Sequence, residues 1–392
     1  MREVVIVGAK RTPIGKFGGS LKDVSAIQLG TLSVKAALQQ ANMNPEEVQS
    51  VIFGNVLQAG LGQNPARQIA IHAQIPYTTP AMTVNEVCGS GLKSVILGSQ
   101  AIQLGEADVV VVGGTENMSL APYLLHDHRF GKKFGSTEIR DSLIYDGLTD
   151  VFEQIHMGVT AEKIAEKFSI TRKEQDEFAL NSQKKAARAI ENGRFNEEIV
   201  PVPVRDKKGK ESLFSEDEYV RKNTTLEDLA RLKPAFVKDG TVTAGNSSGI
   251  NDGAAALILM EKSRAEKHGI PYLGKIKAYH EVGVEPIMMG YAPFYAIKGL
   301  LDKTGKTTNE IDLYEINEAF ASQSIAVIRD LALDGEKVNV NGGAIALGHP
   351  IGASGARILV TLLHEMQKRD SHLGVASLCV GGGIGIAMMI ER

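Results

Sequence analysis

The chain has 392 residues, of which 43% are hydrophobic, 23% charged and 5% aromatic, with a formal net charge of −3. This length and composition predict a globular protein of about two to three domains and exclude disorder, collagen and coiled coil. The small net charge gives no reason to expect nucleic acid or a membrane surface as a partner. Two cysteines cannot build a disulfide framework, so we expect a reducing compartment, the cytoplasm.

Strands and helices alternate along the first part of the chain. Apolar runs and helical apolar spacing predict strands at 4–7, 51–54 and 109–112 and helices at 26–40, 65–73 and 90–104. Asn44 and Pro45 predict the start of one further short helix. Such alternation is typical of mixed or parallel sheets that helices cover.

The middle of the chain, residues 119–249, is polar and rich in loop-like sequence. It contains a capping box at Thr171 and Glu174 and a proline-, lysine- and glutamate-rich stretch at 201–218. Behind it an apolar strand is predicted at 253–260, followed by a second capping box at Ser263 and Glu266. We interpret the middle as an insertion into a core that resumes after it.

The last third of the chain repeats the order of the first. Segments 311–317, 338–343 and 375–383, with a helix at 356–366, follow the pattern of the earlier strands and helices. The uncharged stretch 373–390 contains five glycines, so it predicts two buried strands around a turn and no membrane span. The pattern predicts an α/β fold with a first half at 1–118 and 250–270, a loop domain at 119–249, and a second half at 271–392.

Two side chains could carry nucleophilic chemistry. Cys88 lies between a predicted strand and a predicted helix, where free N–H groups and the helix dipole lower the pKa of a thiol. The alternative interpretation is that Cys88 serves only as a small apolar residue packed in a core. His349 lies in the uncharged loop 341–355, flanked by glycine and proline, where it could act as a base or a hydrogen-bond donor. A purely structural histidine remains the alternative.

A second cysteine and a conspicuous asparagine complete the candidates. Cys379 ends a strand that runs into the three glycines 381–383, whose amides could approach a substrate oxygen. No room remains after them for a dinucleotide-binding unit. Asn317 follows a strand and precedes a helix, so an ordinary N-cap is its alternative. His126 and His128 lack zinc-ligand spacing, and we expect no metal site.

Four motifs together resemble the thiolase family, in order and over essentially the whole chain. They are Asn-Glu-Val-Cys-Gly-Ser-Gly at 85–91, Asn-Glu-Ala-Phe at 317–320, Gly-His-Pro at 348–350 and Cys-Val-Gly at 379–381. The resemblance implies a thiolase fold with two similar halves, each a mixed five-stranded sheet layered with helices. It also implies an acyltransferase that reversibly condenses two acetyl-CoA to acetoacetyl-CoA and CoA.

The resemblance assigns a role to each candidate. Cys88 becomes the nucleophile that carries the acyl group, and His349 activates it and helps to bind the thioester oxygen. Cys379 becomes the acid and base at the α-carbon of the second acyl-CoA. Asn317 holds a water in one oxyanion hole, and the amides of Gly381 and Cys88 form the other. Dividing the reaction into acyl transfer and carbanion attack suits two thiols on one channel.

Further residues follow from the same resemblance. His156, Met157, Arg221 and Ser248 are expected along the path of coenzyme A, and Met157 and Met289 are expected to narrow the acyl pocket. The CoA thioesters are substrates, and no tightly bound cofactor is implied. Loop 119–141 corresponds to the tetramer-forming region of the family, so a homotetramer is expected.

Three other functions compete with this one. Ketoacyl synthases and hydroxymethylglutaryl-CoA synthases resemble the fold but use a single cysteine, which Cys379 argues against. A catalytically silent CoA-binding protein would be expected to lose a thiol or His349, and all are present. A cysteine hydrolase would need no second thiol.

Overall fold

Two sheets of matching topology frame the molecule in the computed structural model, which describes residues 2–205 and 208–392. The first half contains, in the order β4-β3-β5-β12-β1, the strands β4 (Ala81–Val84), β3 (Ser50–Gly54), β5 (Val109–Asn117), β12 (Asn251–Glu261) and β1 (Val4–Arg11). The second half contains, in the order β14-β15-β16-β13, the strands β14 (Leu313–Ile316), β15 (Leu373–Val380), β16 (Ile384–Glu391) and β13 (Gly274–Gly283).

The two halves pair their strands in the same way, as the sequence pattern predicts. β3 runs parallel to β5, and β14 runs parallel to β15. Antiparallel pairs follow in both halves, from β5 through β12 to β1 and from β15 through β16 to β13. The α/β fold with two similar halves is therefore confirmed.

The second sheet differs from the predicted five strands. Its fifth strand is reduced to one parallel bridge between Tyr314 and Val338. The next residue, Asn339, has a φ of 44°, outside the strand region. Its side chain bonds both the N–H and the carbonyl of Ile316, each at 2.8 Å, and so replaces the backbone ladder. The two sheets also join, because β1 and β13 share the pairs Val5–Lys275 and Ile6–Gly274.

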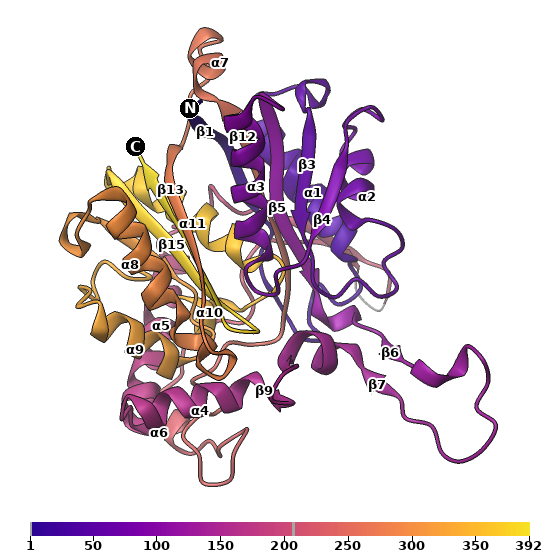
Figure 1. Cartoon of the computed structure of the whole chain (residues 1–392), viewed down its shortest axis with the longest axis vertical. Coiled ribbons are helices and arrows are strands. Elements are labelled where there is room, and N and C mark those ends of the chain that lie inside the picture. Colours follow the sequence, from indigo (N-terminus) through magenta and orange to yellow (C-terminus); the bar gives the residue numbers. More distant parts are fainter. Residues whose placement is uncertain (1, 206–207) are drawn as a thin grey trace.

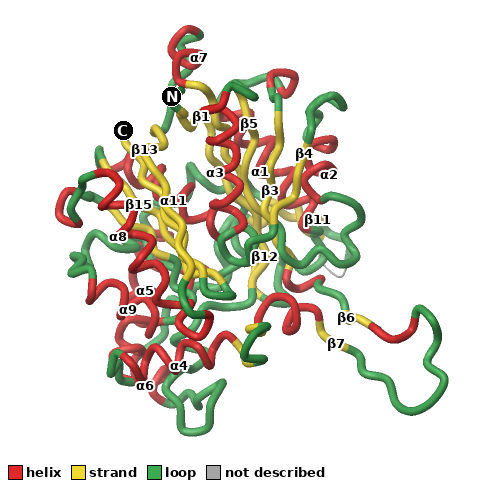
Figure 2. The backbone as a smooth tube through the Cα atoms, in the orientation of Figure 1, coloured by secondary structure: helices red, strands yellow, loops and turns green. Residues whose placement is uncertain are grey.

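Helices form three layers around the sheets (Figures 1 and 2). The helices α3 (Ser90–Leu104) and α11 (Ser354–Arg369) lie between the two sheets, where their apolar side chains share one core with both. The helices α1 (Ala26–Gln40) and α2 (Pro65–His72) cover the other face of the first sheet. The helices α8 (Ala292–Thr304) and α9 (Ala321–Asp330) cover the other face of the second.

The middle of the chain combines short strands with helices that pack on the second half. Its helices are α4 (Met157–Lys167), α5 (Arg172–Glu191) and α6 (Leu226–Ala230). A thin arm that carries β6 (Tyr123–Leu124) and β7 (Arg140–Asp141) stands away from the body (Figure 1). Residues 206 and 207 of the predicted loop domain lie outside the described residues. The exact domain boundaries stay a prediction.

Local signals in the sequence are mostly confirmed. The capping box of Thr171 and Glu174 begins α5, and the stretch 373–390 forms β15 and β16 around a glycine turn. The capping box at Ser263 is wrong, because α7 (Lys262–Lys267) begins two residues earlier than that box requires. Glu261 caps it, accepting the Arg264 N–H at 2.8 Å. No helix within the described residues has the length and apolarity to cross a membrane.

Candidate functional site

A cavity of about 290 Å³ lies where the two halves and the middle segment meet. Its lining brings together eight of the ten predicted site residues, which are Cys88, His156, Met157, Ser248, Met289, His349, Cys379 and Gly381. The sequence places these residues in six separate segments of the chain. The fold therefore assembles one site from motifs that the sequence shows only separately.

Cys88 lies on a tight turn between β4 and α3. Val87 has a φ of 45°, a left-handed conformation that is unfavourable for a β-branched residue. Two side chains hold the turn: Asn85 accepts the Val87 N–H at 3.0 Å, and the Ser90 hydroxyl donates to the Val87 carbonyl at 2.6 Å. The turn brings Cys88 to the beginning of α3, where the sequence predicts it.

The pKa of the Cys88 thiol shifts in the opposite direction to the one expected from its position at a helix start. Burial raises the pKa of the Cys88 thiol to about 11, although N–H bonds from Gly381 and from Cys88 itself oppose the shift. Burial also lowers the pKa of His349 to about 3, and the nearby Arg357 adds to this effect. At neutral pH the free protein therefore holds a neutral thiol beside a neutral imidazole.

His349 lies on a buried loop that other elements fix. Its backbone N–H donates to the side chain of Asn251 at 2.9 Å, and its Nδ1 lies 2.6 Å from the hydroxyl of Ser354. Gly348, directly before it, has a φ of 109°, and a Cβ there would lie 2.5 Å from the Asn251 side chain. Glycine is thus required for the loop to pass so close to β12.

Asn317 lies behind the imidazole rather than in the lining of the cavity. Its amide nitrogen is 3.5 Å from both ring nitrogens of His349. Its Oδ1 is buried and has no hydrogen-bond partner among the described residues. Asn317 is not an N-cap, since Phe320 takes that position ahead of α9. A buried amide with a free oxygen beside the histidine suits a role in binding a water or a substrate atom.

Cys379 is the last residue but one of β15 and is buried. Burial and the neighbouring Cys88 raise the pKa of its thiol. Two residues later the Gly381 N–H reaches the Cys88 sulfur, which links the second half to Cys88 of the first half. Gly382 and Gly383, with φ of 85° and 88°, complete the turn that makes this approach possible.

Methionines and aromatic rings form the apolar wall of the cavity. Met157 and Met289 pack in one cluster with Cys379 and Phe320, so both border the second thiol. His156 caps α4, its Nδ1 accepting the Gly158 N–H at 3.0 Å, and its ring stacks on Phe236 with centroids 4.7 Å apart. Because Nδ1 accepts, Nε2 of the neutral ring carries the hydrogen and can donate it.

Arg221, like Asn317, does not line the cavity. It is exposed, and its guanidinium lies 5.4 Å from the ring centroid of Tyr219, which does line the cavity. Its backbone N–H donates to Gln183 at 2.7 Å. Ser248 lies in the lining, and its N–H donates to the Ala319 carbonyl at 2.9 Å.

Two buried carboxylates, which we did not predict as site residues, hold loops around the candidate site. Glu116 accepts N–H bonds from Val56, Leu57 and Gly352 and from the Asn55 amide, at 2.9–3.1 Å. Glu318 accepts from Ser182, Asn339 and the Ile345 N–H. Glu318 lies within the Asn-Glu-Ala-Phe motif, so its place in the sequence was a usable signal. Glu116 lies outside the four motifs, and its partners come from distant loops.

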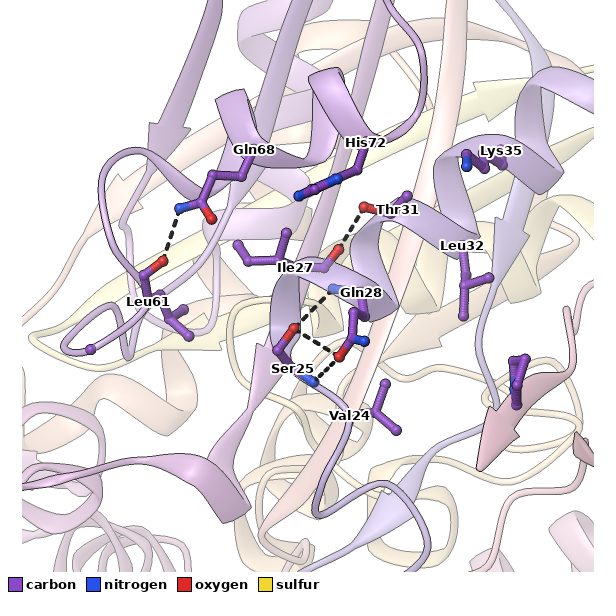
Figure 3. A pocket seen from close by; sticks show the side chains of 12 residues that line it. Val24, Ser25, Ile27, Gln28, Thr31, Leu32, Lys35, Leu61, Gln68 and His72 are labelled. Atoms are coloured by element: carbon purple, nitrogen blue, oxygen red, sulfur yellow. Dashed lines mark hydrogen bonds between the residues drawn. The ribbon is translucent and has the colours of Figure 1, made fainter. Parts of the chain in front are cut away.

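A larger hollow of about 700 Å³ lies elsewhere, beside α1 and α2 (Figure 3). Several of its polar groups bond to one another: Ser25 to Gln28, Thr31 to the Ile27 carbonyl and Gln68 to the Leu61 carbonyl. None of the predicted site residues lines it. Within the described residues, no three His, Cys, Asp or Glu side chains gather in a way that could hold a metal ion.

Comparison with known proteins agrees with this arrangement. The profile of the thiolase N-terminal domain matches residues 4–263, and that of the thiolase C-terminal domain matches residues 270–392. The chain belongs to the thiolase family. As a thiolase it is an acyltransferase, and the two profiles meet where the first half gives way to the second.

Relatives cover the thiolase chain from end to end. Acetyl-CoA acetyltransferases of Cupriavidus necator and Pseudomonas aeruginosa are each 54% identical to it over 392 residues, with all of both chains covered. The crystal structure of the Bacillus anthracis acetyl-CoA acetyltransferase superposes with a TM-score of 0.97 at 47% identity. The crystal structure of human mitochondrial 3-ketoacyl-CoA thiolase superposes with a TM-score of 0.96 at 47% identity. Each comparison covers 100% of this chain and 99% of the other.

Proposed function

We propose that this thiolase interconverts two acetyl-CoA with acetoacetyl-CoA and free CoA through an acyl group on Cys88. The observation that carries the proposal is the meeting of two thiols from different halves at one cavity, with the Gly381 N–H at the Cys88 sulfur. A single-cysteine enzyme of similar fold would not need Cys379 there. The arrangement supports a reaction in two steps, acyl transfer followed by carbon–carbon bond formation.

In the first step the Cys88 sulfur attacks the thioester carbon of acetyl-CoA. The thiol proton passes to His349, which is neutral and able to accept it. The carbon–sulfur bond to CoA breaks, and Cys379 gives its thiol proton to the leaving thiolate. Free CoA departs, His349 keeps the proton from Cys88, and Cys379 becomes a thiolate. The N–H groups of Cys88 and Gly381, which already point at this sulfur, stabilise the oxygen of the tetrahedral intermediate.

In the second step the Cys379 thiolate removes an α-proton from a second acetyl-CoA. The resulting carbanion attacks the acyl carbon, and the bond between that carbon and the Cys88 sulfur breaks as acetoacetyl-CoA forms. The Cys88 thiolate then takes its proton back from His349. Asn317, with its buried and unpartnered Oδ1, and the protonated His349 bind the enolate oxygen, Asn317 through a water. Thiolysis is the same sequence in reverse, so the physiological direction depends on the concentrations of the metabolites.

Coenzyme A thioesters enter past His156, Met157, Ser248 and Met289, all of which line the cavity. The cavity of about 290 Å³ takes the thioester end, and Arg221 meets the nucleotide outside it by stacking or by charge. The buried methionines leave room for a short acyl group and make acetyl and acetoacetyl groups the preferred ones. No tightly bound cofactor is needed for these steps.

We propose a homotetramer in the cytoplasm, and the protruding arm supports association between copies of the chain. Phe130 and Phe134, in the arm between β6 and β7, are 93% and 96% exposed. An exposed apolar patch of this kind marks a protein interface, and a second copy of the chain is the occupant we propose. Light scattering of the variant Phe130→Asp/Phe134→Asp should then show a lower mass than that of the unmodified protein.

Separating the two thiols tests the proposed roles. Cys379→Ser should still form acyl-enzyme from labelled acetyl-CoA, while its condensation rate falls by roughly 10²–10⁴-fold, as for a lost general acid and base. Cys88→Ala should trap no label at all. The label is located by acid quench and peptide mapping. Label on Cys379 of the unmodified protein, or label retained by Cys88→Ala, would show that the roles are reversed.

A further inference from the structure

The hydroxyl of Ser354 takes part in two hydrogen bonds but has only one hydrogen to donate. Its Oγ lies 2.6 Å from Nδ1 of His349 and 2.9 Å from the carbonyl oxygen of Pro350. A carbonyl oxygen can only accept, so the hydroxyl hydrogen goes to Pro350. The bond to the imidazole then forms only if Nδ1 carries a hydrogen and donates it to Oγ. The opposite tautomer would leave one of the two bonds unmade inside the protein.

The His349 ring also has the Asn317 amide nitrogen 3.5 Å from both of its nitrogens, but an amide NH₂ group can only donate and so offers no acceptor for a hydrogen on Nδ1. The His349 N–H is held by Asn251, whose own amide donates to the Gly15 carbonyl at 3.0 Å. Ser354 is the first residue of α11 and is fully buried, so the acceptor for Nδ1 is itself part of a packed helix. Neither end of the Nδ1 bond can move without moving a buried element.

We infer that Ser354 is a positioning residue, which holds the hydrogen of the neutral imidazole on Nδ1 and leaves Nε2 free to accept the Cys88 proton. In that transfer the S–H bond breaks, the sulfur keeps the electron pair, and an N–H bond forms at Nε2. The same nitrogen then becomes a donor, while Nδ1 stays on Ser354 throughout. One hydroxyl thus decides which ring nitrogen does the chemistry. The inference rests on the proposed role of His349.

The experiment measures the rate at which acyl-Cys88 forms from labelled acetyl-CoA by rapid acid quench. Ser354→Ala removes the acceptor for Nδ1, and this rate should fall about 10- to 100-fold, the effect of leaving one buried donor unpaired. The KM for acetyl-CoA should change little, because Ser354 does not line the cavity. Ser354→Thr keeps a hydroxyl and should restore most of the rate. If Ser354→Ala fails to fold, Ser354→Cys, with its weak acceptor, takes its place and should show the same direction.

A matched control separates positioning from stability. Ser33 is also fully buried in a helix, and its hydroxyl donates to the Gly30 carbonyl at 2.8 Å, in α1 and away from the cavity. Ser33→Ala should lose stability as Ser354→Ala does and keep the rate of acylation. A Ser354→Ala protein that acylates at the unmodified rate, or a Ser354→Thr protein as slow as Ser354→Ala, would overturn the inference.

A His349→Ala variant distinguishes this inference from the proposed function. If His349→Ala is inactive and Ser354→Ala is unimpaired, only the positioning role is wrong. If His349→Ala acylates normally, His349 is not the base, and both the proposed role of His349 and the inference about Ser354 are wrong. If His349→Ala and Ser354→Ala both acylate slowly and Ser354→Thr recovers the rate, the proposed role of His349 and the inference about Ser354 are both supported.

Discussion

The neutral state of the Cys88 thiol can be tested by alkylation across pH. Burial raises the pKa of this thiol to about 11, so about one molecule in 10⁴ carries the thiolate at pH 7. Because iodoacetamide reacts with the thiolate, the rate of alkylation should rise about tenfold for each pH unit from 7 to 10. The total increase over that range is about 10³-fold. No plateau should appear below pH 10.

The assay uses Cys379→Ala, in which Cys88 is the only remaining thiol, and mass spectrometry of the modified peptide after timed quenching. Cys88→Ala serves as the control for reaction at Cys379. A preformed thiolate–imidazolium pair would instead react at a constant rate between about pH 5 and pH 9. That plateau would refute the reasoning, since it would show that the N–H donors of Gly381 and Cys88 outweigh burial.

Three further changes test packing and pocket size. Gly114→Ala places a Cβ 2.1 Å from the Gly352 carbonyl oxygen, so the free energy of unfolding in urea should fall by about 2 kcal/mol and activity should fall with it. Arg11→Ala leaves Glu198 and Asp217 buried without their cation and should cost about 3–5 kcal/mol in the same measurement. Met157→Ala should raise kcat/KM for a longer 3-ketoacyl-CoA relative to acetoacetyl-CoA by about tenfold. An unchanged ratio would mean that Met157 does not limit the acyl pocket.

Periodicity and capping in the sequence were enough to locate most elements. The predicted helices at 26–40 and 90–104 match α1 and α3 residue for residue. The repeat in element order correctly anticipated two sheets of equal topology. The fifth strand that the family resemblance implies for the second half is reduced to one bridge, because the side chain of Asn339 replaces the backbone pairing at Ile316. Propensity scales cannot predict the bonds between the Asn339 side chain and the Ile316 backbone, because these bonds depend on where Ile316 lies in the fold.

The candidate site shows a similar division between what is local and what is not. The sequence motifs identified Cys88, His349 and Cys379 as candidates, and the fold places all three at one cavity. The direction of the Cys88 pKa shift could not be read from its position at a helix start, because burial depends on the second half of the chain. Ser354 lies only five residues after His349, but its role appears only once the loop path brings its hydroxyl to Nδ1.

The position of α11 affects how the protein unfolds. Residues 354–366 of this helix are all buried, and the helix packs against α3 and both sheets, so it has almost no face of its own toward water. Separating the halves would expose this apolar surface, so neither half can lose its structure while the other keeps a complete core. Heat or denaturant should therefore produce one cooperative transition, and the amide hydrogens of α11 should be among the slowest to exchange with solvent. Catalytic competence is then lost together with the fold as a whole, rather than by the halves drifting apart.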